Sequence, residues 1–182
     1  GVADDANGAT TLTITVADVN DITPTYTATS TTPTVNEGAT AVDSNVAITD
    51  ADTGDSNSCT LGGADAGSFT CTLTGQTAYS IAFSSAPDYE NPGSAGSSNE
   101  YTVTVTINDG SNDGATITYT VTVADANDQT PVYQAADADD AITVNENVGT
   151  GSIDAGTITD TDTVGTYGCT LGGADAADFA CS

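Results

Sequence analysis

The sequence of 182 residues contains no lysine, no arginine and no histidine. Its 26 acidic residues therefore give a formal net charge of −26 that no side chain of the chain can balance. Nucleic acid is disfavoured as a partner, because phosphate binding depends on Lys and Arg, and an anionic membrane surface would repel the chain. The natural partners are hard cations such as calcium, which prefer carboxylate and carbonyl oxygens.

Methionine and tryptophan are also absent, and no stretch is long and apolar enough to span a membrane. We therefore expect no membrane insertion in this segment. No signal peptide is visible, and the sequence opens almost directly into a strand-like pattern. This favours the interpretation that the 182 residues are an excerpt of something longer.

Threonine alternates with apolar residues in runs such as "TLTITVAD" (11–18), "YTVTVTIND" (101–109) and "TITYTVTVAD" (116–125). Alternation of β-branched residues with a period of two is typical of half-buried strands. Turn residues separate seven such segments, as expected for a β-sandwich. The predicted strands are near 25–35, 45–49, 58–61, 68–73, 78–83, 100–107 and 115–125.

The sequence repeats itself. "VADVNDITPTY" (16–26) matches "VADANDQTPVY" (123–133) at an offset of 107, and "CTLGGADAGSFTC" (59–71) matches "CTLGGADAADFAC" (169–181) at an offset of 110. Such internal similarity indicates tandem structural units. We expect the last strand of a preceding repeat at 1–22, a complete repeat at 23–130, and the first half of a following repeat at 131–182.

The four cysteines form two pairs with equal spacing, because Cys59 and Cys71 are 12 residues apart, as are Cys169 and Cys181. Equivalent positions in two units suggest one disulfide per unit, although buried reduced thiols remain an alternative. A zinc site is disfavoured, since two cysteines without histidine supply too few ligands. Disulfides would place the chain in an oxidising, extracellular setting.

Acidic motifs occur in a fixed order within the complete unit: "VNEG" (35–38), "TDADTGDSN" (49–57), "APDYEN" (86–91), "INDG" (107–110) and "VADANDQTP" (123–131). This order resembles the cadherin repeat, in a prokaryotic or otherwise non-classical form, since the cysteine pair is not part of the usual cadherin pattern. The resemblance implies an all-β fold of tandem seven-stranded Greek-key sandwiches. It also implies no catalytic site, and calcium ions bound at the junctions between consecutive repeats.

Carried onto this sequence, the resemblance implies two sets of calcium ligands. At the first junction they are Asp18, Asn20, Asp21, Asp50, Asp52, Asn57 and Asp109. At the second junction they are Glu37, Asp88, Glu90, Asp125, Asn127, Asp128, Asp160 and Asp162. Seven of the second set are carboxylates, which could not all stay ionised in one small site without cations. The following unit has Tyr167 at the position of Asn57.

The predicted function is therefore that of an extracellular structural or adhesive protein at a cell surface. Its calcium-rigidified repeats would form a filament or a stalk, with further copies of the same repeat or subunit, and also a cell-surface molecule, as partners. The alternative is an adhesin module that binds carbohydrate, which would need an aromatic-lined pocket. We do not expect an enzyme: Asp88 and Glu90 are a pair of carboxylates as in glycosidases, but their acidic neighbours favour calcium ligation.

Overall fold

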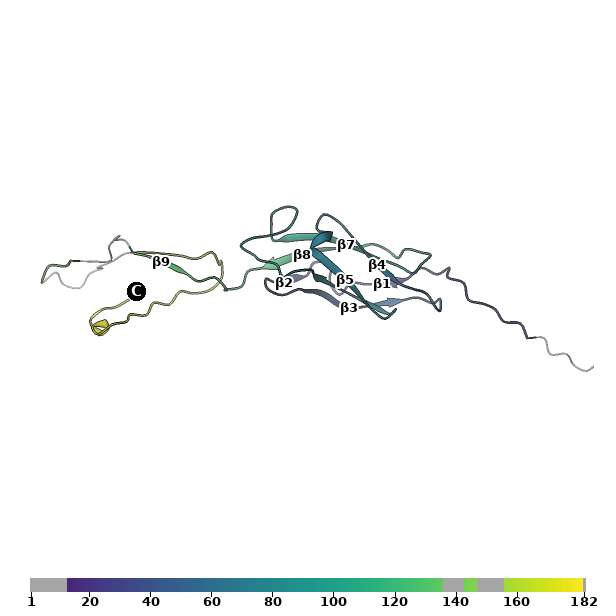
Figure 1. Cartoon of the computed structure of the whole chain (residues 1–182), viewed down its shortest axis with the longest axis horizontal. Coiled ribbons are helices and arrows are strands. Elements are labelled where there is room, and N and C mark those ends of the chain that lie inside the picture. The colour runs from purple at the N-terminus through teal and green to yellow at the C-terminus, as the bar shows by residue number, and fades with distance from the viewer. Residues whose placement is uncertain (1–12, 136–142, 147–155, 182) are drawn as a thin grey trace, which may run out of the picture.

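The computed structural model describes residues 13–135, 143–146 and 156–181. The predicted strand at 11–18 lies partly outside these residues, as does the segment "TVNENVGT" (143–150), which resembles "TVNEGAT" (34–40). Figure 1 shows an elongated molecule whose central part is a β-sandwich. Residues 13–22 extend from one end of the sandwich, and residues 125–135 leave from the other end.

The sandwich consists of two sheets with four strands each. One sheet has the order β1 (Thr25–Tyr26), β3 (Ala41–Thr49), β6 (Ala78–Phe83) and β5 (Phe69–Thr74). The other has the order β2 (Thr34–Asn36), β8 (Ile117–Ala124), β7 (Glu100–Asn108) and β4 (Ser58–Gly62). Neighbouring strands are antiparallel except β2 and β8, which are parallel. The prediction of an all-β Greek-key sandwich is confirmed.

The first predicted strand, 25–35, is divided between the two sheets. β1 pairs with β3 in one sheet, and β2 pairs with β8 in the other. Between them the Thr29 amide donates to the Asp43 side chain instead of to a neighbouring strand, and Pro33 has no amide hydrogen to offer a ladder. The second strand begins at Ala41 rather than at 45, because irregular register around Asp43 interrupts the alternation that marks a strand.

Alternating side chains of β7 and β8 fill the core. Val103 and Val105 of β7 and Tyr119 and Val121 of β8 are completely buried, while the threonines between them face outward. Near one end of the core the rings of Phe69 and Phe83 stack with centroids 4.5 Å apart. Threonine is tolerated at so many positions because it only has to cover the outer face of each sheet.

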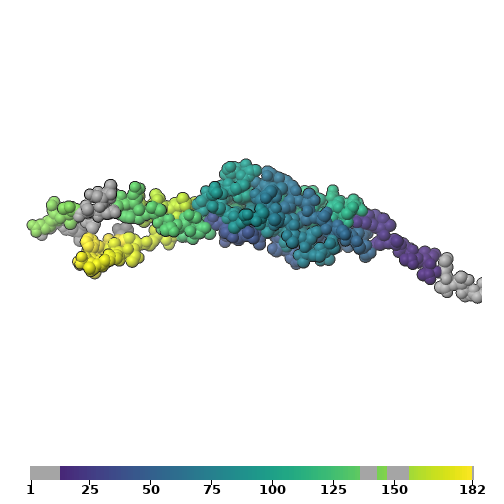
Figure 2. All heavy atoms as spheres, in the orientation of Figure 1, coloured from purple at the N-terminus to yellow at the C-terminus, as the bar shows by residue number. Residues whose placement is uncertain are grey.

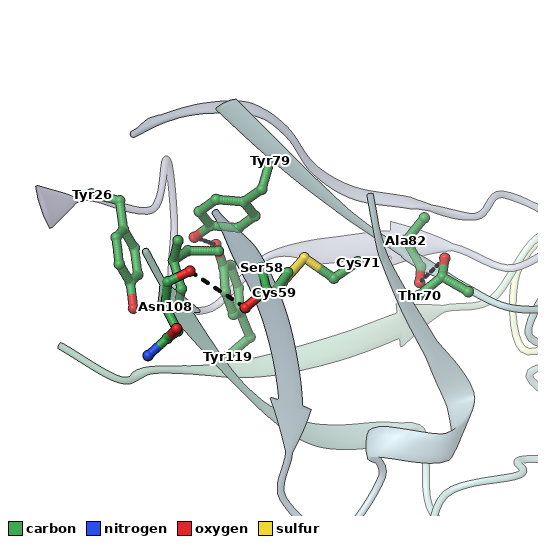
Figure 3. Close-up of a disulfide and its surroundings, with 10 residues drawn as sticks. Tyr26, Ser58, Cys59, Thr70, Cys71, Tyr79, Ala82, Asn108 and Tyr119 are labelled. Carbon is green, nitrogen blue, oxygen red and sulfur yellow. Dashed lines mark hydrogen bonds between the residues drawn. A yellow bond between two sulfur atoms is a disulfide. The ribbon is translucent and has the colours of Figure 1, made fainter. Parts of the chain in front are cut away.

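A disulfide joins the two sheets along one side. Cys59 of β4 and Cys71 of β5 are bonded, with Cα atoms 6.2 Å apart. β4 and β5 are edge strands of their sheets. Figure 3 shows this bond beside the packed rings of Tyr79 and Tyr119. Cys169 and Cys181 are also bonded, with Cα atoms 6.0 Å apart. Both predicted pairings are therefore present, and the alternative of reduced thiols is wrong.

The segment after the sandwich repeats the start of the sandwich. β9 (Val132–Gln134) pairs with β10 (Thr157–Thr159), and the register of Val132 with Thr159 corresponds to that of Thr25 with Thr49. The short 3₁₀ turn η2 (Ala176–Asp178) corresponds to η1 (Ala66–Ser68). Among the described residues, no helix has the length and apolar character needed to cross a membrane.

The described residues 13–22 are extended but form no ladder with a described strand. Ile14 and Val16 are 76% and 88% exposed, whereas their counterparts in the repeat, Val121 and Val123, are buried. A strand is defined by its hydrogen-bonded neighbour, and within the described part of the chain none lies beside this segment. The proposed strand at 1–22 stays a prediction.

Candidate metal centres at the two ends of the sandwich

The parallel pairing of β2 and β8 brings two acidic motifs together at one end of the sandwich. Asn36 lies opposite Ala124, so the residues that follow them, Glu37 and Asp125, leave the sheet side by side. The Glu37 amide donates to the carbonyl oxygen of Ala124 at 2.9 Å. Motifs that are 88 positions apart in the sequence thus meet because of the register of one strand pair.

Glu37 is 8% exposed and organises this end. Its Oε2 accepts from the Tyr89 amide at 2.8 Å, and its Oε1 accepts from the Ala126 amide at 2.7 Å. The first bond holds the loop that carries Asp88 and Glu90. One carboxylate oxygen each from Glu37, Asp88 and Glu90 therefore lie within 4.8 Å of one another.

A second group of carboxylates at this end spans the junction. One oxygen each from Glu90, Asp128 and Asp162 lie within 4.8 Å of one another, so Glu90 belongs to both groups. The Gln129 amide donates to Asp162 Oδ2 at 2.9 Å, and Thr163 donates to Asp125 through its amide and hydroxyl. These bonds fix the following segment to the end of the sandwich. Figure 2 shows a narrow waist in the molecule at this place.

The opposite end of the sandwich contains the same arrangement. Thr53 donates to Asp18 Oδ2 through its amide and hydroxyl, both at 2.7 Å. The amides of Asp21 and Ile22 donate to Asp52 Oδ2 at 2.8 and 2.7 Å. These contacts correspond to those of Thr163 with Asp125 and of Gln129 with Asp162. At each end the second acid of the Asp-x-Asp motif thus accepts a bond from the amide of the residue directly after Asp-x-Asn-Asp.

Several acids at the two ends, and Asn57, keep buried oxygen atoms without a hydrogen-bond partner in the described chain. They are Asp50 Oδ2, Asp55 Oδ2, Asn57 Oδ1 and Asp109 Oδ2 at the first end, and both Oε atoms of Glu90, Asp125 Oδ1 and Asp162 Oδ1 at the second. Buried polar atoms are normally satisfied, and the sequence has no basic side chain to satisfy them. Oxygen-only groups of this kind fit calcium, which takes six to eight oxygen ligands.

The pKa shifts of carboxyl groups at the two ends follow from their burial, their acidic neighbours and their hydrogen bonds. Burial, and then the charges of Glu37, Asp125 and Asp162, raise the pKa of Glu90 above its ordinary value. Burial and the charges of Asp50, Asp52, Asp109 and Asp18 raise the pKa of Asp55 in the same way. Asp18 differs, because its bonds from the Thr53 hydroxyl and amide lower its pKa. Carboxyl groups whose charge is disfavoured are the ones that a bound cation would stabilise.

Comparison with solved structures identifies the fold. Protocadherin gammaB7 repeats EC3-6, solved as a cis-dimer, match with a TM-score of 0.54 and 27% identity over 81% of this chain and 34% of that one. Mouse cadherin-23 EC22-24 matches with a TM-score of 0.54 and 26% identity over 79% of this chain and 46% of that one. Human cadherin-23 EC21-23 matches with a TM-score of 0.50 and 28% identity, over 82% and 49%.

The chain has a cadherin-like fold. It spans between a third and a half of the length of these solved chains. No protein-family model matches it, and no curated protein matches it. The resemblance inferred from the acidic motifs is confirmed at the level of the fold.

Within this cadherin-like fold, most of the predicted ligands gather at the expected ends. Asn20 lies at the first end, where its side-chain amide donates to the backbone oxygen of Asp109 at 3.1 Å. Asp160 lies at the second end, where its Oδ1 accepts from the Asp162 amide at 3.2 Å. Asn57 is also placed at the first end, but its Nδ2 donates to the Gln76 backbone. Their role as calcium ligands stays a prediction.

Two residues at the ends were not predicted as ligands. Asp55 has an oxygen within 4.8 Å of those of Asp50 and Asp52, and the third acid of "TDADTGDSN" (49–57) was the signal for it in the sequence. Asn99 has a buried Oδ1 atom without a partner, while its Nδ2 donates to the Tyr89 oxygen at 3.0 Å. No motif marks Asn99, since it is placed only by the packing of the 84–99 loop.

Proposed function

We propose that this chain is part of an extracellular structural or adhesive array of tandem cadherin-like repeats that are rigidified by calcium. The array has the form of a filament or a cell-surface stalk. In this proposal residues 23–130 are one complete repeat, 1–22 end the preceding repeat, and 131–182 begin the following one. The partners are further copies of the same repeat or subunit, together with a molecule at a cell surface.

One observation carries the proposal: the same hydrogen-bonded pair of motifs, Asp-x-Asn-Asp with Asp-x-Asp, occurs at both ends of one sandwich. We call each pair of motifs an acidic half-cage. In each, a threonine donates to the first Asp of Asp-x-Asn-Asp, and amides after that motif donate to the second Asp of Asp-x-Asp. Each half-cage retains buried carboxylate oxygens without partners. A cation that binds these oxygens would link residues from both sides of the junction.

Charge explains why such a junction would depend on calcium. Glu90 belongs both to the carboxylate group with Glu37 and Asp88 and to the group with Asp128 and Asp162, and only Asp162 comes from the following segment. Without cations their mutual repulsion favours separation of the two segments, and with cations the same oxygens hold them together. The junction is thus expected to change from flexible to stiff as calcium binds.

The extracellular assignment has two supports. The disulfides Cys59–Cys71 and Cys169–Cys181 are stable in oxidising compartments. The second support is the similar fold of the ectodomain repeats of protocadherin gammaB7 and cadherin-23. The cis-dimer of protocadherin gammaB7 is consistent with a partner of the same kind for this chain. We assign no catalytic role to any of its carboxylates.

The carbohydrate-binding alternative has less support. An open depression is lined by Thr25, Tyr26, Thr27, Ala47 and Thr49 and contains one aromatic ring. The hydroxyl of Tyr26 already accepts a bond from the Ile107 amide at 3.0 Å. A sugar site normally stacks its ligand on exposed aromatic faces, and this depression offers one ring whose polar group is occupied.

The proposal is tested by calcium titration of the whole chain and of the variant Glu90→Gln, followed by calorimetry and thermal unfolding. Calcium at 100 times its dissociation constant should stabilise the folded chain by about 2.7 kcal/mol per site, and chelator should reverse this. Because Glu90 belongs to two carboxylate groups, Glu90→Gln should weaken calcium binding at its end about tenfold or more. The matched control Glu100→Gln changes an exposed acid and should have no effect.

An absence of binding heat, together with an unchanged melting curve in excess chelator, would contradict calcium as the ligand. Equal loss of calcium affinity in Glu90→Gln and Glu100→Gln would show that calcium binding depends only on the total charge of the chain. Either result would overturn the proposed junction.

A further inference from the structure

The loop between β3 and β4 contains a group of acids that the cadherin-like motifs do not account for. Asp50 and Asp52 belong to the Asp-x-Asp motif, whereas Asp55 does not. One carboxylate oxygen from each of the three lies within 4.8 Å of the others. Within the described residues no donor reaches the Asp55 carboxylate, and its Oδ2 atom is buried. The side chain thus has no structural role that explains its position.

Asp109 provides an independent indication of a ligand. It follows β7 and is 1% exposed. Its Oδ1 accepts from the amides of Ser111 and Asn112 at 2.7 and 2.6 Å, but its Oδ2 is buried and has no partner in the described chain. Asp109 lies at the same end as the loop acids, because Asn20 donates its side-chain amide to the Asp109 backbone oxygen at 3.1 Å and the next residue, Asp21, donates its amide to Asp52 Oδ2. A fully buried carboxylate oxygen without a donor, at the same end as three further acids, fits a bound cation.

The corresponding loop of the following segment is different. At an offset of 110, Gly165 stands at the position of Asp55, and Tyr167 at that of Asn57. Gly165 has φ of +116°, and a Cβ atom there would lie 2.0 Å from Asn127 Nδ2, so no other side chain fits without a rearrangement. Tyr167 is 58% exposed. The carboxylate of Asp55 therefore has no counterpart in the loop at 160–167.

We propose that Asp55 is a calcium ligand, which together with Asp50 and Asp52 forms an oxygen-only site within the β3–β4 loop of a single repeat. This inference rests on the proposed function, because it takes calcium to be the cation of the chain. It adds a ligand outside the cadherin motifs, so that the first end has a calcium site that the second end lacks. The three acids come from one short loop, so this site holds its ion without a carboxylate of another repeat. The loop at 160–167 has no such site.

The test is a calcium titration of the ¹⁵N-labelled whole chain, followed by NMR. The amides of Ile22 and Thr53, which donate to Asp52 and Asp18, report on the first end. The amides of Gln129 and Thr163, which donate to Asp162 and Asp125, report on the second end. Each end therefore yields its own calcium midpoint in one sample.

Asp55→Asn should raise the calcium midpoint of the first-end amides about tenfold or more, because it removes one ligand charge while it keeps the shape of the side chain. The second-end midpoint should stay unchanged. Asp178→Asn is the matched control, since Asp178 is an exposed acid of η2 outside both acidic ends. It should change neither midpoint.

The outcomes separate this inference from the proposed function. If the unmodified chain shows no calcium-dependent shifts at either end, the proposed function fails and this inference fails with it. If calcium binds at both ends and Asp55→Asn keeps the first-end midpoint of the unmodified chain, only the role of Asp55 is overturned. Unchanged core amide shifts in the absence of calcium would show that the variant is folded.

Discussion

The carboxylate of Asp43 lies inside the sandwich, 6% exposed, in a chain that has no basic residue to pair with it. Its Oδ2 accepts from the Thr29 amide at 2.8 Å and from the Tyr119 hydroxyl at 3.1 Å. The Tyr119 hydroxyl has a single hydrogen, so Tyr79 is the donor in the 3.0 Å contact between the two hydroxyls. Neutral donors thus stabilise a buried charge, and the network links both sheets.

This network makes stability sensitive to alkaline pH. Burial raises the pKa of Tyr79 and of Tyr119 above the ordinary value of 10.0. The folded state therefore retains protons that the unfolded state loses, so stability is full below pH 10 and declines as pH rises above it. Each unit above pH 10 should cost about 1.4 kcal/mol per buried tyrosine, until the pH reaches the folded-state pKa.

Tyr119→Phe should lower the free energy of unfolding at pH 8 by about 1–3 kcal/mol, because Asp43 and Tyr79 each lose a partner. It should also reduce the loss of stability between pH 8 and pH 11, since one group fewer titrates. Urea unfolding at pH 8 and at pH 11 measures both changes in the free energy of unfolding. Tyr167→Phe removes an exposed hydroxyl and should match the unmodified chain. Equal pH dependence of the chain and of Tyr119→Phe would contradict the role of the network.

At the scale of the elements, the two sheets are held together differently along their two sides. On one side the chain itself crosses between the sheets, from β1 to β2. On the other side the edge strands β4 and β5 are joined by Cys59–Cys71. The chain also crosses on this side, from β4 through η1 to β5, so the disulfide adds a second covalent connection between these two edge strands.

Replacing Cys59 and Cys71 together by alanine should lower the free energy of unfolding of the sandwich by about 3 kcal/mol. The bond closes a loop with a sequence separation of 12, and its loss frees that loop in the unfolded state. Urea unfolding followed by circular dichroism, at one fixed calcium concentration, measures the change. The control replaces Cys169 and Cys181 in the same way and should leave the sandwich transition unchanged. A loss as large in the control would show that the effect is not local.

At the scale of the molecule, the chain is extended because its two acidic centres lie at opposite ends of one sandwich (Figures 1 and 2). The connection after Ala124 is fixed by contacts such as those of Gln129 with Asp162 and of Thr163 with Asp125. Repeats joined in this way contact only their neighbours, so their array grows in one direction.

Small-angle X-ray scattering should show a longer and narrower distance distribution with calcium than with chelator. In the proposed function, calcium would hold the following segment in line with the sandwich, whereas repulsion among carboxylates would free it when calcium is removed. Glu90→Gln should need more calcium to reach the extended profile. Profiles that coincide with and without calcium would contradict a calcium-stiffened junction, whatever the affinity for the ion.

The features determined by the sequence alone are local ones. Strands such as 78–83 and 100–107 follow from the alternation of residues along one segment, and the two disulfides follow from equal spacing in two copies. The candidate ligands follow from short motifs that resemble those of cadherins. These features were predictable because each depends on neighbours in the chain and not on how distant segments pair.

Only the tertiary structure decided how these segments combine. The register of Asn36 with Ala124 places Glu37 beside Asp125, and between β1 and β2 the Thr29 amide bonds to the side chain of Asp43 in β3. Asp55 could be assigned to the acidic group only when its oxygen was seen near those of Asp50 and Asp52. The physical reason is that the pairing of strands, which spacing along the chain does not specify, determines which distant carboxylates share one site.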